Sequence, residues 1–486
     1  MLKLNISFKY YSFLIAFVFS INSIAQVKKT IAPAPVYPIP TAKQLAWHEM
    51  EMNAFIHFTT NTFTDKEWGY GDESNSVFNP TNVDANQWAS NLKNAGFKMM
   101  ILTTKHHDGF CLWPSKFTEH SIKNSPYKNG KGDIVKETSD AAQKAGLKFG
   151  VYLSPWDRNR ADYGKPSYVD YYRNQLKELF TQYGKVTEMW FDGANGGDGF
   201  YGGANEKRKI DGKTFYQWSE TLKLIRSIQP NVVFFSDAGP DIRWVGNEQG
   251  KAGRTNWNNI TTDTLYAGKG GIEELLNTGS AEGKNWVPAE VDVSIRPSWF
   301  YHAKEDSLVK TPEKLFEIYL SSVGRGSNLL LNVPPDRTGQ FHANDVKALQ
   351  GFSALMKKEL GENLAVKAVV KANSYRTGFT PNALTDGNKG TYWATNDDVK
   401  TARLEVNLGS QKTVKYVLLQ EYIQLGQRIK TFSIDVWKDG KWQTVANETT
   451  IGYKRIVKIS PEKTDKIRVN ILDSRACPVL SNVEVF

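Results

Sequence analysis

The sequence of 486 residues contains little cysteine and histidine, the residues from which disulfide scaffolds and zinc sites are built. Its two cysteines, Cys111 and Cys477, cannot form the framework of a small disulfide-rich protein, and we expect two free, partly buried thiols. Its seven histidines include no His-x-x-x-His pair, whereas a zinc site needs about three or four ligands at regular spacing. The sequence therefore argues against metal catalysis.

Long hydrophobic runs are absent after the N-terminal region, so no membrane-spanning helix is expected. Within residues 1–25, Lys3 and Lys9 precede the short apolar run 11–21, and small residues follow it up to Ala25. This pattern predicts a cleaved secretory signal peptide. We therefore expect the mature protein to be exported to the periplasm or to the cell exterior.

Charge of one sign is not concentrated in any segment. The formal net charge is +10, but the lysines are scattered and form no basic run of the kind that follows a phosphate backbone. A nucleic-acid partner is therefore not expected. Aromatic residues make up 12% of the chain and include 14 tryptophans, and flat aromatic rings are the surfaces on which sugar rings stack. The composition favours a carbohydrate partner.

Residues 26–362 repeat one pattern, in which a helix and a glycine precede an apolar strand with a polar end. Helices are predicted at 133–145 and 168–183, and Gly146 and Gly184 follow them as helix C-caps. The repeat predicts a (β/α)8-type TIM barrel. Strands are expected at 52–58, 97–104, 147–154, 185–192, 231–236, 290–294 and 327–333, and further helices from Asp84 and over 343–360. The stretch 238–288 is predicted to be a long irregular segment over the rim of the barrel.

The pattern changes in residues 363–486, where short apolar runs follow one another with turns but no helices between them. This alternation is typical of an all-β sandwich, and we expect a second domain here. Strands are predicted at 404–408, 414–420, 431–437, 455–459 and 466–471.

Polar and aromatic residues follow three of the predicted barrel strands. His106 and His107 come after strand 97–104, Trp156 after strand 147–154, and Asp192 ends strand 185–192 just before a glycine. The C-terminal ends of barrel strands meet at one rim, so these side chains should line one pocket that fits a small polar ring. We expect the two histidines to be neutral hydrogen-bond partners for sugar hydroxyls rather than zinc ligands.

A glycosidase needs two carboxyl groups, one on each side of the bond that it breaks. Asp192 is the first candidate. Glu248 is the second, because it lies in the irregular segment beside Trp244, whose ring would desolvate the carboxyl and raise its pKa as a general acid requires. Glu290, on a predicted strand, is the alternative to Glu248.

Four motifs resemble the glycoside hydrolase family 29 α-L-fucosidases. They are the runs from His57 to Gly69, from Thr104 to Phe110, from Tyr152 to Trp156 and from Trp190 to Gly193. The resemblance covers roughly residues 40–360 and implies a retaining exo-α-L-fucosidase with Asp192 as the nucleophile. It also implies a fucose pocket that requires no cofactor and is formed by His57, Glu67, Trp68, His106, His107, Tyr152 and Trp190, with Trp299 near the fucose methyl group.

The segment from Gly239 to Glu248 resembles the branch of this family that is selective for α-1,3/1,4 linkages in branched, Lewis-type glycans. In that branch the glutamate is the acid/base, which implies this role for Glu248. Residues 363–486 resemble a discoidin-like carbohydrate-binding module. The resemblance implies a possible structural calcium ion near Asp386.

Three other functions stay open at this point. They are a broader-specificity α-L-fucosidase, an exo-glycosidase for a related sugar such as galactose, and a non-catalytic glycan-binding protein. The presence of Asp192 together with the histidine pair argues against the last of these. The C-terminal domain could equally have a purely structural role.

Overall fold

The computed structural model describes Met1 and residues 31–486. The signal peptide predicted for residues 1–25 lies outside the described residues, apart from Met1. Residues 33–486 form one compact unit. This unit contains both a barrel and a C-terminal β domain.

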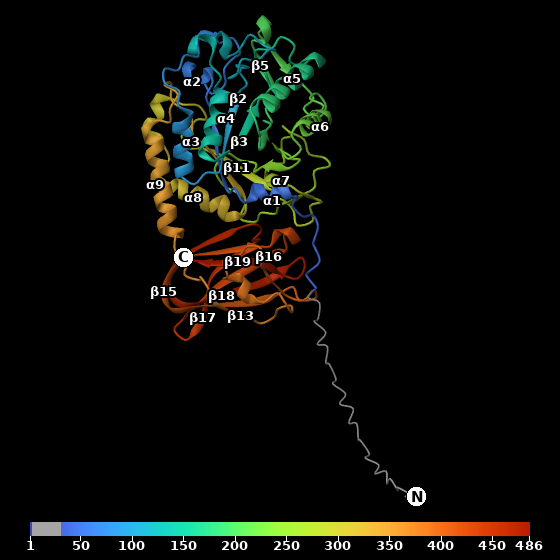
Figure 1. The fold of residues 1–486 in the computed structure, drawn as a ribbon, viewed down its shortest axis with the longest axis vertical. Helices are drawn as coiled ribbons and strands as arrows, with labels where there is room; N and C mark the ends of the chain where they lie inside the picture. Colours follow the sequence, from blue (N-terminus) through green and yellow to red (C-terminus); the bar gives the residue numbers. More distant parts are fainter. Residues whose placement is uncertain (2–30) are drawn as a thin grey trace. The chain divides into compact units, whose positions relative to one another are not determined.

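Eight parallel strands close into a barrel, which confirms the predicted fold class (Figure 1). Each strand pairs with its neighbours in the order β1-β12-β11-β8-β7-β4-β3-β2. The strands are β1 (Met52–Ile56), β2 (Met99–Lys105), β3 (Lys148–Leu153), β4 (Glu188–Trp190), β7 (Val233–Ser236), β8 (Ile242–Trp244), β11 (Ala289–Ser294) and β12 (Asn328–Asn332).

Helices lie outside this barrel and follow most of its strands (Figure 1). Asp84 caps α3 by accepting hydrogen bonds from two backbone N–H groups, and Asp133 caps α4 by accepting one, from Lys136. Gly146 ends α4 with a φ of 70°, as the sequence predicted. The helices are α1 (Ala42–His48), α2 (Thr60–Thr64), α3 (Ala85–Asn94), α4 (Ile134–Ala145), α5 (Pro166–Gln182), α6 (Trp218–Ile228), α7 (Glu273–Thr278), α8 (Pro312–Ser321) and α9 (Ala343–Leu360).

The sequence-based interpretation of residues 238–288 as irregular was wrong at one point, because this stretch contains the barrel strand β8. Strands β7 and β8 pair in parallel although only residues 237–241 separate them, so no helix lies between them. The short strand contains Arg243, whose fully buried guanidinium donates to the carbonyls of Leu276 and Trp257. A three-residue strand centred on an arginine does not show the apolar run by which the other strands were recognised. Two further strands of this stretch, β9 (Asn259–Ile260) and β10 (Asn285–Trp286), pair with each other outside the barrel.

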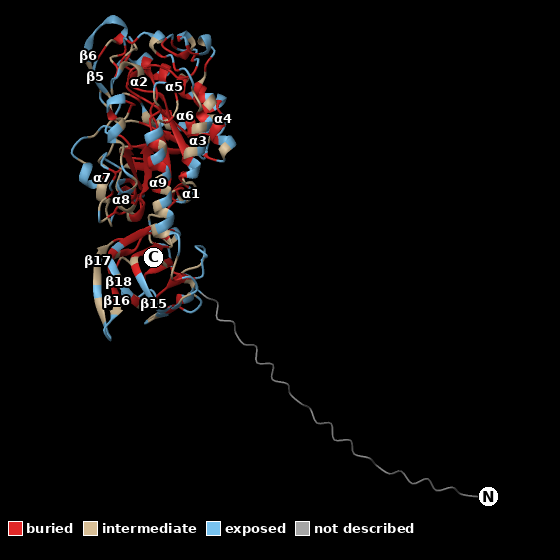
Figure 2. Ribbon diagram, turned by 90° about the vertical axis from the view of Figure 1, so that its left-hand side faces the viewer, coloured by how far each residue is buried: buried red, intermediate tan, exposed pale blue. Residues whose placement is uncertain are grey.

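Apolar residues fill both sides of the barrel wall (Figure 2). The larger cluster lies between strands and helices and includes Trp88 and Leu92 of α3, which the sequence predicted to be buried. A smaller cluster inside the barrel contains Trp47 of α1 together with residues of the strands, such as Phe55, Tyr152 and Trp190. This packed interior supports the rim at which the strands end.

The C-terminal domain is an antiparallel β structure with strand order β14-β19-β15-β18-β16-β17, and β13 pairs with β15. The runs predicted as separate strands at 404–408 and 414–420 form one long strand with a register shift between Asn407 and Lys412. The strands are β13 (Val369–Ala372), β14 (Trp393–Ala394), β15 (Ala402–Glu421), β16 (Ile429–Lys438), β17 (Lys441–Thr449), β18 (Arg455–Ser474) and β19 (Val479–Val485).

Cys111 and Cys477 are free and buried, which confirms the expected thiols. Among the residues that the structure describes, no helix combines the length and hydrophobicity that crossing a bilayer requires. The same residues contain no cluster of three or more His, Cys, Asp or Glu side chains that could hold a metal ion.

Candidate active site

A cavity of about 290 Å³ lies at the C-terminal ends of the barrel strands. It brings together nine of the ten site residues predicted from the sequence, all except Glu67. The predicted residues that line it are His57, Trp68, His106, His107, Tyr152, Trp190, Asp192, Glu248 and Trp299, and they are joined by Phe55, Ala194 and Asp292.

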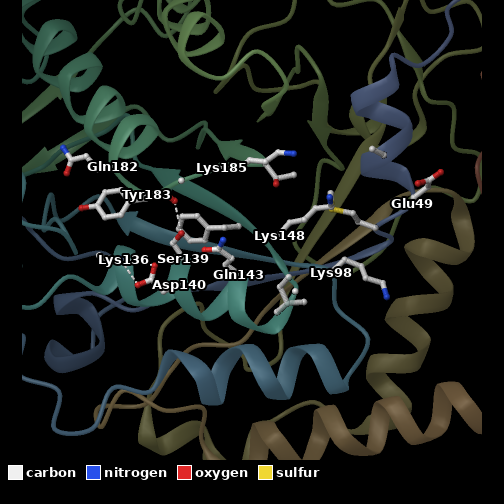
Figure 3. A pocket seen from close by; sticks show the side chains of 17 residues that line it. Glu49, Lys98, Lys136, Ser139, Asp140, Gln143, Lys148, Gln182, Tyr183 and Lys185 are labelled. Carbon is white, nitrogen blue, oxygen red and sulfur yellow. Dashed lines mark hydrogen bonds and ion pairs between the residues drawn. The ribbon is translucent and has the colours of Figure 1, made fainter.

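A larger groove, of about 670 Å³, lies at the opposite end of the barrel (Figure 3). Lys98 and Lys148, next to the N-terminal ends of β2 and β3, line it, and its Asp140 already pairs with Lys136 at 2.8 Å. Active sites of this fold form at the C-terminal ends of the strands. The smaller cavity is therefore the candidate active site.

Asp192 follows β4 and is held by groups close to it in the barrel. The Tyr152 hydroxyl donates to Oδ2 at 2.9 Å, and the Ala194 backbone N–H donates to Oδ1 at 2.7 Å. His107 Nε2 lies 3.8 Å from Oδ2. A Cβ atom at Gly193 would overlap the carboxylate of Asp237, so a larger residue in the turn after Asp192 would displace that side chain. These contacts fix the carboxylate in one orientation while a quarter of the side chain (25%) stays exposed to the cavity and solvent.

Glu248 lies beyond β8, on the loop that the sequence singled out, and is exposed at the mouth of the cavity. Trp299 Nε1 donates to its Oε2 at 3.3 Å. Partial burial raises the pKa of Glu248, and the negative charges of Asp192 and Glu67 add to this effect. A carboxyl group with a raised pKa keeps its proton to higher pH, which is what a general acid needs.

The three histidines of the cavity are buried and uncharged near neutral pH. Burial lowers the pKa of His57 to about 3 and that of His107 to about 4, and it lowers the pKa of His106 well below its usual range. His57 Nδ1 lies 2.8 Å from Asn332 Oδ1, and His107 Nδ1 lies 2.7 Å from Ser154 Oγ. Neutral, positioned imidazoles can donate to or accept from sugar hydroxyls.

Glu67 is the predicted site residue that does not line the cavity. Its carboxylate accepts hydrogen bonds from the backbone N–H groups of Trp299 and Phe300, at 2.8 and 3.1 Å, and lies 2.8 Å from His302 Nε2. Glu67 therefore holds the loop that places Trp299 over the cavity. The neighbouring Trp68 contacts His107 edge to face, with ring centroids 5.3 Å apart.

Asp292 is a carboxyl group of the cavity that the sequence-based reasoning missed. It is buried, and Trp244 Nε1 donates to its Oδ1 at 2.8 Å. Burial raises its pKa well above the usual range, and the charge of Glu248 acts in the same direction. The alternation of Glu290, Asp292 and Ser294 along β11 was the signal available in the sequence, because alternate residues of a barrel strand face the interior.

Glu290, the alternative acid/base, does not line the cavity. It is fully buried inside the barrel, where Trp190 Nε1 donates to its Oε2 at 3.2 Å and where it contacts Glu188. Burial and the neighbouring Glu188 raise the pKa of Glu290 well above its usual range. A side chain in this place supports Trp190 from below and has no path to a leaving group in the cavity.

Comparison with known proteins identifies the family of the chain. The model of the α-L-fucosidase family matches residues 19–361, and the model of the F5/8 type C domain matches residues 369–484. The chain belongs to the α-L-fucosidase family. It is a glycoside hydrolase whose barrel carries the fucosidase site and whose C-terminal β domain is of the F5/8 type C, or discoidin-like, kind.

Relatives of this α-L-fucosidase cover nearly its whole length. Alpha-L-fucosidase 1 of Arabidopsis thaliana is 39% identical over 483 residues, which are 97% of this chain and 92% of the plant protein. The crystal structure of SpGH29 superposes with a TM-score of 0.88 at 39% identity, covering 94% of this chain and 99% of the other. A Ruminococcus gnavus GH29 fucosidase in complex with fucose superposes with a TM-score of 0.84 at 33% identity, covering 94% and 97%.

Proposed function

We propose that this α-L-fucosidase works by a retaining, two-step mechanism in which Asp192 is the nucleophile and Glu248 the acid/base. The proposal is carried by one observation, namely that two carboxyl groups with different environments line one sugar-sized cavity. Asp192 is held by Tyr152 and the backbone, as suits a group that must attack one carbon atom. Glu248 has a raised pKa and lies at the mouth, where a leaving group would depart.

In the first step, an oxygen of Asp192 bonds to the anomeric carbon while the bond from that carbon to the leaving oxygen breaks. The Glu248 carboxyl group donates its proton to the leaving oxygen. In the second step, the Glu248 carboxylate removes a proton from water, and the water oxygen displaces Asp192. Two inversions release fucose with the configuration of the substrate.

The fucose ring would bind between the imidazoles and the indoles of the cavity. His57, His106 and His107 offer neutral hydrogen-bonding groups to hydroxyls, and Trp299 offers an apolar face to the methyl group. Glu248 is an exposed residue of the cavity lining, which suits removal of a terminal residue from a longer glycan.

We further propose that the enzyme prefers fucose in α-1,3 or α-1,4 linkage to branched glycans. The support is the likeness of residues 239–248 to the family branch with this selectivity. A screen of α-1,2, α-1,3, α-1,4 and α-1,6 fucosides tests it, because equal rates on all four would instead indicate the broader-specificity enzyme.

Two further proposals concern the location of the enzyme and a metal ion in its C-terminal domain. We propose that the enzyme is exported, on the basis of the pattern in residues 1–25. The calcium ion suggested near Asp386 has little support, because the carboxylate already accepts from Asn388 N–H at 2.7 Å and from the Thr391 hydroxyl at 2.8 Å within its own turn. Calcium sites usually combine several oxygen ligands.

Trapping with azide tests the roles of the two carboxyl groups. Asp192→Ala should lower turnover of an aryl fucoside by ~10³-fold or more, since no covalent intermediate can form. Azide should then give the fucosyl azide of inverted configuration. In Glu248→Ala, azide should intercept the fucosyl-enzyme and give the retained configuration. Interchanged products, or release of inverted fucose by the unaltered enzyme, would refute the assignment.

A further inference from the structure

The segment that carries Glu248 has no helix or strand of its own between β8 and β9, over residues 245–258. Within the described chain, the Glu248 carboxyl accepts one side-chain hydrogen bond, the long one from Trp299. The position of this carboxyl therefore depends on what holds the backbone on either side of it.

The barrel holds the segment on both sides of Glu248. The backbone N–H of Val245 donates to the carbonyl of Glu290 at 3.1 Å. A little further on, Ser321 at the end of α8 accepts from the N–H of Ala252 and donates through its hydroxyl to the carbonyl of Gly250, both at 2.9 Å. The loop that carries Glu248 is thus attached to the barrel at its base.

Further along the segment, at residues 256–258, the C-terminal domain holds it through a buried glutamine. The side-chain amide of Gln427 accepts from the backbone N–H of Asn258 at 2.8 Å and donates to the carbonyl of Asn256 at 2.9 Å. The side chain of Gln427 is fully buried. It satisfies two backbone groups that would otherwise be left unpaired in the interior, which makes the contact costly to lose.

Residues 447–450, at the end of β17 and just beyond it, add further contacts to the same segment. The Arg254 guanidinium donates to both oxygens of Glu448 at 3.1 Å and to the Asn447 carbonyl at 2.6 Å. The Thr450 hydroxyl accepts from the backbone N–H of Asn256 at 3.0 Å. Arg455 of β18 donates to the carbonyl of Arg254 at 2.8 Å. Residues 254–258, called the clamped segment below, are thus bonded to strands of the other domain.

We propose that the C-terminal domain is a positioning element for the acid/base, acting through the clamped segment, with Gln427 and the Arg254–Glu448 pair as its positioning residues. This inference rests on the proposed role of Glu248. The C-terminal domain would then contribute to the fucosidase reaction without binding a glycan itself. Loosening the clamp should let the Glu248 loop move and leave Asp192 in place, because Asp192 is held within the barrel.

Substrates with different leaving groups distinguish the contribution of Glu248 to the rate from that of Asp192. Protonation matters most when the leaving group is poor, so kcat/KM should be measured on a 4-nitrophenyl fucoside and on an unactivated fucosyl oligosaccharide. For Gln427→Ala we expect a loss of ~10-fold or more on the oligosaccharide and of less than ~3-fold on the nitrophenyl substrate, since general-acid catalysis contributes about 10²–10⁴-fold. Arg254→Ala, at an exposed side chain that should tolerate change, is expected to show the same bias to a smaller degree.

Lys415→Ala is the matched control. Lys415 also joins the two domains, through an ion pair with Glu359 of α9 at 2.9 Å, but it does not touch the clamped segment. It should leave both substrates unaffected. If Gln427→Ala and Arg254→Ala behave like this control, or lose equal activity on both substrates, the positioning proposal is wrong.

A double-variant cycle distinguishes failure of this inference from failure of the proposed function. If Gln427 acts through Glu248, adding Gln427→Ala to Glu248→Ala should cause no further loss that depends on the leaving group. Additive losses would overturn the inference alone. A Glu248→Ala enzyme without bias against the poor leaving group would instead overturn the acid/base assignment itself.

Discussion

Asp192 and Glu248 line the same cavity, but different parts of the molecule hold them. Asp192 directly follows a barrel strand, and its carboxylate accepts from Tyr152 on the adjacent strand and from the backbone two residues on. Glu248 lies on an irregular loop whose far end is bonded to the C-terminal domain. The proposed nucleophile is thus held by local structure. The loop of the proposed acid/base is bonded to the barrel and, at its far end, to residues 169 to 194 positions away in the chain.

This difference matches what each group must do. A nucleophile attacks one carbon atom from one direction, so a rigid strand end suits it. An acid/base must reach a leaving oxygen and later a water molecule, so a loop at the mouth suits it. Substitutions beside each carboxyl group test this difference between Asp192 and Glu248.

The largest loss of kcat/KM is expected from a substitution beside Asp192, the proposed nucleophile. Tyr152→Phe removes the hydroxyl that donates to Asp192 Oδ2 at 2.9 Å and keeps the ring that lines the cavity. We expect kcat/KM to fall by ~10–100-fold, since small misplacements of reacting groups cost on the order of 10²-fold. The loss should be similar on nitrophenyl and oligosaccharide substrates. A loss confined to the oligosaccharide would mean that Tyr152 serves the acid/base instead.

The next effect is expected on the side of the acid/base. Trp299→Phe removes the indole N–H that donates to Glu248 Oε2 at 3.3 Å and keeps an aromatic wall. We expect kcat/KM on a fucosyl oligosaccharide to fall by ~10-fold, with a smaller loss on the nitrophenyl fucoside. Measuring kcat/KM of Trp299→Phe and of Tyr152→Phe on both substrates compares the two sides of the site directly. Equal losses on both substrates would show that Trp299 acts only as a wall for the sugar.

The sequence predicted the strand-held part of the site better than the loop-held part. Helix caps such as Asp84 of α3 and Gly146 of α4 are local signals. The strands that follow these two helices are β2, which ends just before His106, and β3, which contains Tyr152. Strand β8 was missed because Arg243 interrupts its short apolar run, and the carbonyl groups to which its guanidinium donates lie far away in the chain. The role of Gln427 could not be predicted either, because its partners lie 169 and 171 residues away in the chain.

Substitution of Asp292 tests whether two or three carboxyl groups of the cavity take part in the reaction. Burial raises the pKa of Asp292 well above its usual range and so favours the uncharged form, and Asn can replace Asp292 as the acceptor for Trp244. We expect Asp292→Asn to keep kcat/KM within ~3-fold of the unaltered enzyme, since no charge is lost. Asp292→Ala should lose more, because Trp244 then loses its partner. A severe defect in Asp292→Asn would mean that Asp292 acts as a carboxylate and would require new roles in the site.

The smallest effect is a shift of the pH profile. The first step needs Glu248 protonated, so activity on an oligosaccharide should fall as the pH rises through the pKa of Glu248. Burial raises this pKa first of all, and the charges of Asp192 and Glu67 raise it further. Glu67→Gln removes one negative charge and keeps one acceptor oxygen, which can serve the backbone N–H of Trp299 or that of Phe300 but not both.

The pKa of Glu248 should then be lower, and the alkaline limb of kcat/KM should move to lower pH, while activity below that limb changes by less than ~3-fold. Gln427→Ala offers a useful comparison, because a loosened loop would expose Glu248 to water and move the limb in the same direction. If neither variant moves the limb, the group that titrates there is not Glu248. The loop-held carboxyl would then lack the environment that distinguishes it from Asp192.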